Sequence, residues 1–244
     1  MRTALITGAS RGIGRGIALS LAQQGYGLTV TSRSESGIAT LAGQLRDAGS
    51  PMTVHRAADM ADRQALPGLV ALHGETFGSM NALIVNAGVG TAGPVDSFRT
   101  DRLDKTVEVN FTAAFVLIQA ALPLLRSAAD ADPALGAKVI AMSSITGAYA
   151  ESGLAVYGAT KAALLSLMET VNLEEGARGV TASAIAPGYV ETDMSAWVTD
   201  TVPADTMIRV SDVVAVVNML LGLSRNTSIT RIVMSRSGAS GYHA

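Results

Sequence analysis

The sequence contains no cysteine among its 244 residues, and only 4% of the residues are aromatic and 16% are charged. The missing thiols exclude disulfide bonds, zinc–thiolate sites and iron–sulfur clusters. The three histidines, His55, His73 and His243, lie far apart and lack the spacing of metal ligands. We therefore expect no metal centre.

The chain also lacks an excess of charge of one sign and a long apolar run. Its formal net charge is −2 at pH 7, which does not favour binding to nucleic acid or to an anionic membrane. No uninterrupted apolar run approaches the roughly 18 residues that span a bilayer, and the start "MRTALITGAS" does not resemble a secretory signal. We expect a soluble, cytoplasmic protein without a nucleic-acid or membrane partner.

Short apolar runs that resemble β-strands alternate with longer stretches that resemble helices. The expected strands cover residues 3–7, 27–32, 52–57, 81–86, 137–144, 180–187 and 230–235. The expected helices cover residues 12–25, a stretch ending near 48, and 62–77, 101–126, 152–176 and 211–224, the last capped by Ser211. This alternation predicts an α/β fold with about seven parallel strands and helices on both faces. Without a linker or a repeat, residues 1–244 are expected to form one doubly wound domain.

The segment "TGASRGIG" (7–14) connects the first expected strand to the first expected helix. Its three glycines, Gly8, Gly12 and Gly14, permit a tight turn, and the helix N-terminus offers free N–H groups to a pyrophosphate. The spacing G-x-x-x-G-x-G differs from the common dinucleotide-binding pattern. The segment predicts a phosphate site, and an ordinary tight connection is the alternative.

The end of the second expected strand, "TSRS" (31–34), bears on the choice of cofactor. An NAD site commonly places an acidic residue there, against the ribose 2′-hydroxyl. Here Ser32 takes that position, Arg33 follows it, and Arg11 lies in the glycine turn. Because a guanidinium pairs with a 2′-phosphate that a carboxylate would repel, the sequence predicts NADP(H). Two solvated surface arginines are the alternative.

Seven motifs in order along nearly the whole chain resemble the short-chain dehydrogenase/reductase family. They are "TGASRGIG", Asp59, "NAG" (86–88), Asn110 in "EVNF", Ser144 in "MSS", "YGATK" (157–161) and "APGYVETD". The resemblance implies a Rossmann-type fold. It also implies an oxidoreductase that transfers a hydride between NADP(H) and a small-molecule carbonyl or secondary alcohol, without a metal.

The resemblance assigns the acid/base role to Tyr157. Positions i and i+4 of a helix share a face, so Lys161 can point into the same cleft. There its ammonium is expected to lower the phenol pKa from about 10 and to hydrogen-bond the nicotinamide ribose. Taken without the other motifs, the pair could equally be an interfacial tyrosine and a solvated lysine.

Two polar residues complete the implied catalytic set. Ser144 lies thirteen residues before Tyr157 and would donate to the substrate carbonyl oxygen, with Ser143 as the alternative. Asn110 would hold a water that links Lys161 to solvent. A helix asparagine bonded to backbone is the alternative for Asn110.

The resemblance also implies a cofactor-binding set in five segments. Asp59 would meet the adenine amino group, the backbone near Val190 would orient the nicotinamide carboxamide, and Thr192 would hydrogen-bond that carboxamide. The full set, with Tyr157 and Lys161, is Gly8, Ser10, Arg11, Gly12, Ile13, Gly14, Ser32, Arg33, Asp59, Met60, Asn86, Ala87, Gly88, Pro187, Gly188, Val190 and Thr192.

Two other functions stay open at this point. One is reduction of a 3-oxoacyl group on an acidic carrier protein. The loop "RSAADADPALGAK" offers Arg126 and Lys138, but Asp130 and Asp132 lie between them and would weaken the encounter; Arg178 follows the next helix. The other is an NADP(H)-binding sensor without turnover, since fold does not dictate function.

The C-terminal part departs from the family pattern. Arg231 stands where a glycine is common, and the segment 193–208, which covers the substrate in relatives, is short and predicts a modest or open pocket. Family members are commonly dimers or tetramers that pair the helices equivalent to 101–126 and 152–176. We expect a homo-oligomer.

Overall fold

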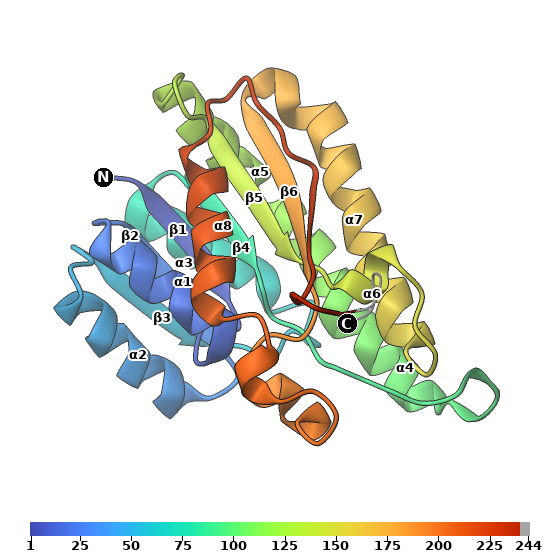
Figure 1. The fold of residues 1–244 in the computed structure, drawn as a ribbon. Coiled ribbons are helices and arrows are strands. Elements are labelled where there is room, and N and C mark those ends of the chain that lie inside the picture. Colours follow the sequence, from blue (N-terminus) through green and yellow to red (C-terminus); the bar gives the residue numbers. More distant parts are fainter. Residues whose placement is uncertain (240–244) are drawn as a thin grey trace.

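The computed structural model describes residues 1–239, so His243 and the end of the C-terminal segment lie outside the described residues. Seven parallel strands form one sheet in the order β3-β2-β1-β4-β5-β6-β7 (Figure 1). The strands are β1 (Thr3–Thr7), β2 (Gly27–Ser32), β3 (Thr53–Ala57), β4 (Ala82–Val85), β5 (Ala137–Met142), β6 (Val180–Pro187) and β7 (Arg231–Met234). The predicted doubly wound α/β fold is confirmed.

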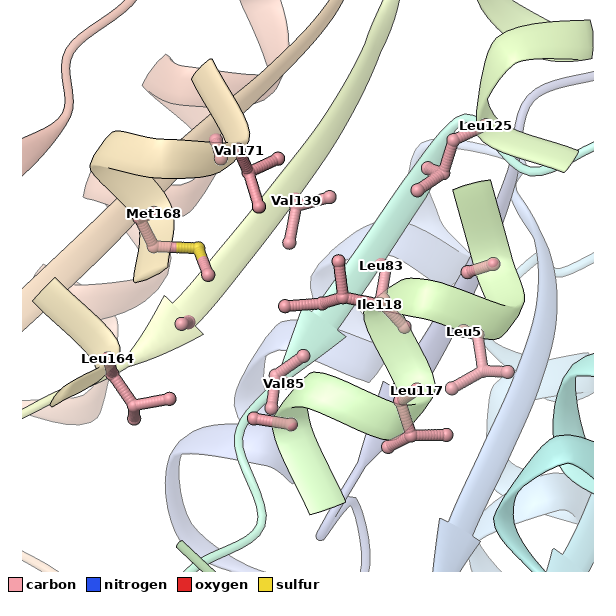
Figure 2. Packing of buried hydrophobic residues seen from close by; sticks show 14 of the residues in the cluster. Leu5, Leu83, Val85, Leu117, Ile118, Leu125, Val139, Leu164, Met168 and Val171 are labelled. Carbon is pink, nitrogen blue, oxygen red and sulfur yellow. The ribbon is translucent and has the colours of Figure 1, made fainter. Parts of the chain in front are cut away.

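Helices cover both faces of the sheet, which explains why its central strands are apolar without alternation. On one face lie α1 (Gly12–Gln23), α2 (Glu35–Asp47) and α8 (Val210–Gly222); on the other lie α3 (Leu66–Phe77), α5 (Ala113–Ala131) and α7 (Ala155–Glu175). All five residues of β1 are buried. Ile6 packs in the core on the side of α1, α2 and α8, and Leu5 packs in the core on the side of α3, α5 and α7. Figure 2 shows α5 and α7 packing side chains such as Ile118 and Met168 over β4 and β5.

Two expected helices differ from those in the structure. The stretch predicted as residues 101–126 consists of α4 (Thr100–Val107), a π-helical turn (Glu108–Thr112) and α5. The stretch predicted as 152–176 begins later, at α7, and a separate short helix α6 (Ile145–Ala148) precedes it. π-helical turns widen a helix by one residue and often mark functional sites, and neither feature has a signal in apolar periodicity.

The predicted cap of the last helix is wrong. Helix α8 starts at Val210, so Ser211 lies inside its first turn and Arg209 is the capping residue. The Asp212 carboxylate instead accepts a hydrogen bond from the Arg209 N–H at 3.2 Å. An acidic side chain in the first turn satisfies a free N–H and favours the positive end of the helix dipole.

The helical stretch Thr100–Ala131 is 32 residues long, and an 18-residue window within it reaches a mean hydropathy of 1.6, so it is long and apolar enough to cross a membrane. Polar residues interrupt its apolar ones, so it contains no long uninterrupted apolar run. Its residues Leu117, Ile118 and Leu125 are buried against the sheet (Figure 2). A core helix of a globular fold meets the same length and hydropathy criteria.

The strand order places a crevice at the carboxyl edge of the sheet. The chain leaves β1 toward β2 on one side and reaches β4 on the other, so β1 and β4 lie at the point where the winding reverses. Ligands of open α/β sheets bind at this point, outside the carboxyl ends of the strands. The remaining irregular turns of the chain are the 3₁₀ helices Val95–Ser97, Gly176–Arg178, Asp193–Val198 and Ala204–Thr206.

Candidate active site

One large cavity, of about 830 Å³, brings together most of the residues that the sequence singled out. The residues from the predicted set that line it are Gly8, Ser10, Arg11, Gly12, Ile13, Ser32, Arg33, Asp59, Met60, Asn86, Ala87, Gly88, Ser144, Tyr157, Lys161, Pro187, Gly188, Val190 and Thr192. Gly14 and Asn110 are not in its lining. Seven segments far apart in the sequence therefore meet at the carboxyl edge of the sheet.

The glycine turn between β1 and α1 depends on the missing side chains. Gly8 has a φ of +64°, in the left-handed region that favours glycine. A Cβ on Gly14 would collide with the Gly8 carbonyl oxygen and would lie 2.5 Å from Asn86 Nδ2. The Asn86 amide donates to the carbonyls of Thr7 and Gly8, at 3.0 and 3.2 Å. Asn86 and Gly14 thus hold the turn in shape, in addition to any contact with a ligand.

The first turn of α1 offers backbone N–H groups to the cavity. Gly12 begins the helix, and the capping residue Arg11 makes no side-chain cap. Free N–H groups and the positive end of the helix dipole form a site for an anion such as a pyrophosphate.

Two arginines line the cavity beside this turn, and they differ in their ion pairs. Arg11 pairs with Asp193 at 3.1 Å, whereas Arg33 is exposed and has no ion pair within residues 1–239. The neighbouring hydroxyl of Ser32 is occupied, because it donates to the Ser34 carbonyl at 3.2 Å. Arg33 is therefore the better placed guanidinium to meet an added phosphate.

Ser144 follows β5 as the capping residue of α6, and its oxygen accepts two hydrogen bonds from Thr146. The Thr146 hydroxyl donates at 2.9 Å and the Thr146 N–H at 3.3 Å. A serine hydroxyl has two lone pairs and one hydrogen. With both lone pairs engaged, the Ser144 hydrogen is left to donate toward the Tyr157 phenol, whose pKa burial raises and Ser144 lowers by less.

The neighbouring Ser143 is hydrogen-bonded to the backbone. Its hydroxyl donates to the Lys161 carbonyl at 2.8 Å and ties the end of β5 to α7. Ser144 is therefore the serine that faces Tyr157, which supports the choice made from the sequence.

Tyr157 and Lys161 lie one turn apart on α7, and both line the cavity. Burial raises the pKa of the Tyr157 phenol above its ordinary value, and the hydrogen bond with Ser144 lowers it by less. The expectation that Lys161 lowers this pKa is therefore wrong for the structure as it stands. The sequence contains the helical spacing of the pair but not the depth at which the phenol lies.

The Lys161 ammonium is oriented by the strand beside it. Its Nζ donates to the Met142 carbonyl at 2.8 Å and lies 5.6 Å from the centroid of the Tyr157 ring. Lys161 is 4% exposed, and burial lowers its pKa to about 8. The lysine thus stays protonated at neutral pH, as a fixed donor at the end of β5.

Asn110 sits in the π-helical turn and is 1% exposed. Its Oδ1 accepts from the Val89 N–H at 2.8 Å, and its Nδ2 donates to the Val89 carbonyl and to Thr160 Oγ1. Asn110 Oδ1 and Lys161 Nζ would each lie 3.3 Å from a Cβ placed on Gly88. The side chain thus supports the loop after β4, which agrees with the alternative reading of a backbone-bonded asparagine.

The sequence predicted one wall of the cavity only in part, through the segment 193–208 that covers the substrate in relatives. This wall, called the apolar wall below, consists of Leu154, Tyr189, Met194 and Trp197. Met194 and Trp197 belong to that segment and Tyr189 to the motif "APGYVETD", whereas no pattern in the sequence singles out Leu154. Thr146 was missed for the same reason.

The part of the chain that the structure describes contains no group of three or more His, Asp or Glu side chains that could hold a metal ion. Asp59, a carboxylate in the cavity lining, accepts a hydrogen bond from the Ala61 N–H at 3.0 Å. Outside the cavity, the unusual Arg231 pairs with Glu169 of α7 at 2.9 Å, so that position ties β7 to α7.

The fold and the site define a class of protein: a doubly wound α/β protein with a glycine turn at the switch point and a serine, tyrosine and lysine at one end of the cavity. Residues 2–203 match the family model for short chain dehydrogenases. The chain therefore belongs to the short-chain dehydrogenase/reductase family, a family of oxidoreductases.

Known proteins are similar to this chain over most of its length. The 3-oxoacyl-[acyl-carrier-protein] reductase FabG of Staphylococcus aureus (strain Mu50 / ATCC 700699) is 32% identical over 201 residues, 82% of this chain and 78% of that protein. The Pseudomonas aeruginosa RhlG/NADP active-site complex has a TM-score of 0.87 and 28% identity, covering 100% of this chain and 96% of that one. A short chain dehydrogenase from Burkholderia cenocepacia J2315, solved in complex with NADP, has a TM-score of 0.85 and 28% identity, covering 98% and 97%.

Proposed function

We propose that this protein interconverts a ketone and a secondary alcohol with NADP(H) as the hydride carrier. The observation that carries the proposal is that Ser144, Tyr157 and Lys161 line one cavity, with the Lys161 Nζ 5.6 Å from the centroid of the Tyr157 ring. Relatives solved with NADP support the choice of cofactor, as does Arg33, which lies beside the glycine turn and has no ion pair among residues 1–239. NADPH, when bound, supplies the hydride that the protein itself lacks.

The residues of the cavity fit such a cofactor. The backbone of the glycine turn and the first N–H groups of α1 would hold the pyrophosphate, and Arg33 would hold the 2′-phosphate. The Lys161 ammonium, fixed by Met142, would hold the nicotinamide ribose. Asp59, Ala87 and Thr192 line the same cavity and would position the adenosine and carboxamide ends.

In the direction of reduction, Ser144 would donate its hydrogen to the carbonyl oxygen, which gains negative charge as the carbon is reduced. Tyr157 would then give its phenolic proton to this oxygen. Because burial raises the Tyr157 pKa, the phenol is protonated at neutral pH and can act as an acid. Oxidation of the alcohol would run the same transfers in reverse and would need the phenolate.

The test is Tyr157→Phe, which removes the transferable proton and keeps the ring. We expect turnover to fall by about 10²- to 10⁴-fold, with NADPH binding and the unfolding transition close to wild type. NADPH consumption is measured across ketones, quinones, sugars and 3-oxoacyl thioesters, and cofactor binding by NADPH fluorescence. Tyr149→Phe, an exposed tyrosine outside the cavity lining, is the control. Activity of the Tyr157 variant within a few-fold of wild type would refute the proposal.

Reduction of a 3-oxoacyl group on a carrier protein is the second candidate, favoured by the similarity to the S. aureus reductase. The cations expected to meet an acidic carrier are mostly engaged. Arg126 pairs with Glu175, and Lys138 is 3% exposed and donates to the Ser224 carbonyl. Arg178 remains at the end of α7. If the carrier is the substrate, a carrier-linked 3-oxoacyl thioester has a lower KM than the same acyl group on a small thiol.

We also propose that residues 1–244 form one domain and that the protein is a cytoplasmic homo-oligomer, either a dimer or a tetramer. The one continuous sheet supports the single domain. Apolar side chains on the outer helices support the oligomer, since Leu173 of α7 is 87% exposed and Phe115 of α5 is 46% exposed. A monomeric mass by light scattering at micromolar concentration would contradict the oligomer.

A further inference from the structure

The apolar wall differs from an ordinary surface in being both exposed and gathered in one place. Trp197 is 65% exposed and Met194 is 48% exposed, and both come from the turn Asp193–Val198. The Trp197 ring meets the Tyr189 ring edge-on, with centroids 6.2 Å apart and planes at 80°. Single exposed apolar side chains are common, whereas a contiguous exposed group marks a binding site.

We propose that the substrate is an uncharged, apolar ketone, or the matching alcohol, whose hydrophobic body packs on the apolar wall. This inference rests on the proposed function, because it takes the reacting carbonyl to lie between Ser144 and Tyr157. The rest of the substrate then packs on the wall, because the wall lines the same cavity as these two residues.

One hydroxyl of the cavity lining is already engaged. The Thr146 hydroxyl donates to Ser144, so it is not free to donate to a substrate. The charged groups that act on Tyr189 are one of each sign, Glu151 and Arg236. A substrate body with its own charge would find no net opposite charge here, and burying that charge without a partner is costly.

The cations nearest the wall are engaged within the protein. Lys161 donates to the Met142 carbonyl, and Arg11 pairs with Asp193, which begins the turn that carries Met194 and Trp197. Arg33 stands beside the glycine turn. Arg102 and Lys105 belong to α4, where they also line a second cavity of about 400 Å³ against Val89, Gly90 and Thr91. A substrate with an anionic end reaching α4 is the competing outcome, and the test is chosen to separate it from the proposal.

The first measurement compares ketones that share one reacting group, methyl next to carbonyl. We expect kcat/KM with NADPH to rise from butan-2-one to hexan-2-one to octan-2-one, by about two- to fourfold for each added methylene. The matched charged ketone is 7-oxooctanoate, in which a carboxylate replaces the terminal methyl of octan-2-one. We expect kcat/KM for it to be at least about tenfold lower. An equal or higher kcat/KM for 7-oxooctanoate would overturn the proposal and would indicate that the carboxylate binds Arg102 and Lys105.

The second measurement alters the wall. We expect Met194→Ala and Trp197→Ala each to raise the KM for octan-2-one about five- to tenfold and to leave butan-2-one nearly unchanged. Met219→Ala is the matched control, because Met219 is 46% exposed on α8 and lies outside the cavity lining. If all three variants keep the wild-type ratio of the KM for octan-2-one to the KM for butan-2-one, the wall does not bind the substrate.

The third measurement reads binding without turnover. Trp197 is the one tryptophan of the sequence, so tryptophan fluorescence of the NADP⁺-loaded protein reports directly on the wall. We expect octan-2-one to change this fluorescence at a lower concentration than 7-oxooctanoate. That result with no turnover of any ketone would refute the proposed reaction and keep the inference. Turnover without a preference for octan-2-one over 7-oxooctanoate would refute the inference about the wall and keep the proposed reaction.

Discussion

The Thr146 hydroxyl donates to Ser144 Oγ at 2.9 Å, and the N–H of the same residue donates to the same oxygen. One residue therefore occupies both lone pairs of the serine that faces Tyr157, and the serine hydrogen is left for the cavity. Helix α6 makes this possible, since Ser144 is its capping residue and Thr146 lies in its first turn. This arrangement determines how the serine can act.

Replacing the Thr146 hydroxyl is therefore expected to affect the reaction through Ser144. In Thr146→Val the serine hydroxyl can rotate, and we expect kcat to fall about tenfold with a small change in KM, as for the loss of one hydrogen bond. Thr146→Ser keeps the donor and should restore kcat. The measurement is steady-state reduction of one ketone by NADPH. Equal kcat in the valine and serine variants would show that the hydroxyl has no role.

Arg33 is expected to determine the preference for the phosphorylated cofactor. Removal of its guanidinium in Arg33→Ala should weaken NADPH binding roughly tenfold to a hundredfold, because a hydrogen bond to a charged group is lost. NADH binding should change little. Arg46→Ala is the control, since Arg46 lies in the last turn of α2 and not in the cavity lining. Dissociation constants from cofactor fluorescence test this, and an equal loss for both cofactors would contradict it.

Gly14 and Gly43 give a matched pair of glycine substitutions in two helices. Gly14→Ala places a methyl group against the Gly8 carbonyl, so we expect a loss of roughly 1–3 kcal/mol in the free energy of unfolding and weaker NADPH binding. Gly43 lies in α2 with nothing within 4 Å of an added Cβ. Gly43→Ala should raise stability by about 0.5–1 kcal/mol, because glycine is a poor helix former. Urea unfolding measures both, and a destabilised Gly43→Ala together with an unaffected Gly14→Ala would contradict the close approach.

His73 is expected to make the fold sensitive to acid. It is fully buried, with Nδ1 2.8 Å from Thr29 Oγ1 and Nε2 3.1 Å from the Ser79 carbonyl. Burial lowers its pKa from 6.5 to about 4. Between these values the unfolded chain binds more protons than the folded one, so stability is complete above about pH 6.5 and falls as the pH drops toward 4.

This histidine alone is expected to remove about 2 kcal/mol from the free energy of unfolding between about pH 7.5 and about pH 5. Urea unfolding at both pH values is compared for wild type and His73→Gln, with the partly exposed His55→Gln as the control. Wild type should lose about 2 kcal/mol more than the His73 variant over this interval. The same pH dependence in all three proteins would show that His73 does not titrate as described.

Part of the fold could be predicted from residue pattern because the pattern is local. Strands β1, β2 and β6 begin and end where the sequence predicted, since each is a short apolar run between a glycine or polar turn and a helix. The pattern failed where a helix changes its hydrogen bonding. The π-helical turn Glu108–Thr112 and the start of α7 at Ala155 leave no mark in apolar periodicity.

The site shows the same division. Motif order selected Ser144, Tyr157 and Lys161, but only the structure separates Ser143, bound to the Lys161 carbonyl, from Ser144. The Tyr157 pKa moves opposite to the expectation from its neighbour Lys161, because burial outweighs other effects. Burial depends on segments far apart in the chain, so the sequence around Tyr157 does not contain it.

The sequence by itself determined the alternation of strands and helices, the glycine turn and the types of reactive side chain, because each depends on residues close together in the chain. The tertiary structure decided which of these side chains share a cavity, how Thr146 orients Ser144, and that Leu154, Tyr189, Met194 and Trp197 form a wall of that cavity. These outcomes come from the packing of distant segments at the carboxyl edge of one sheet, and packing is set by the whole chain at once.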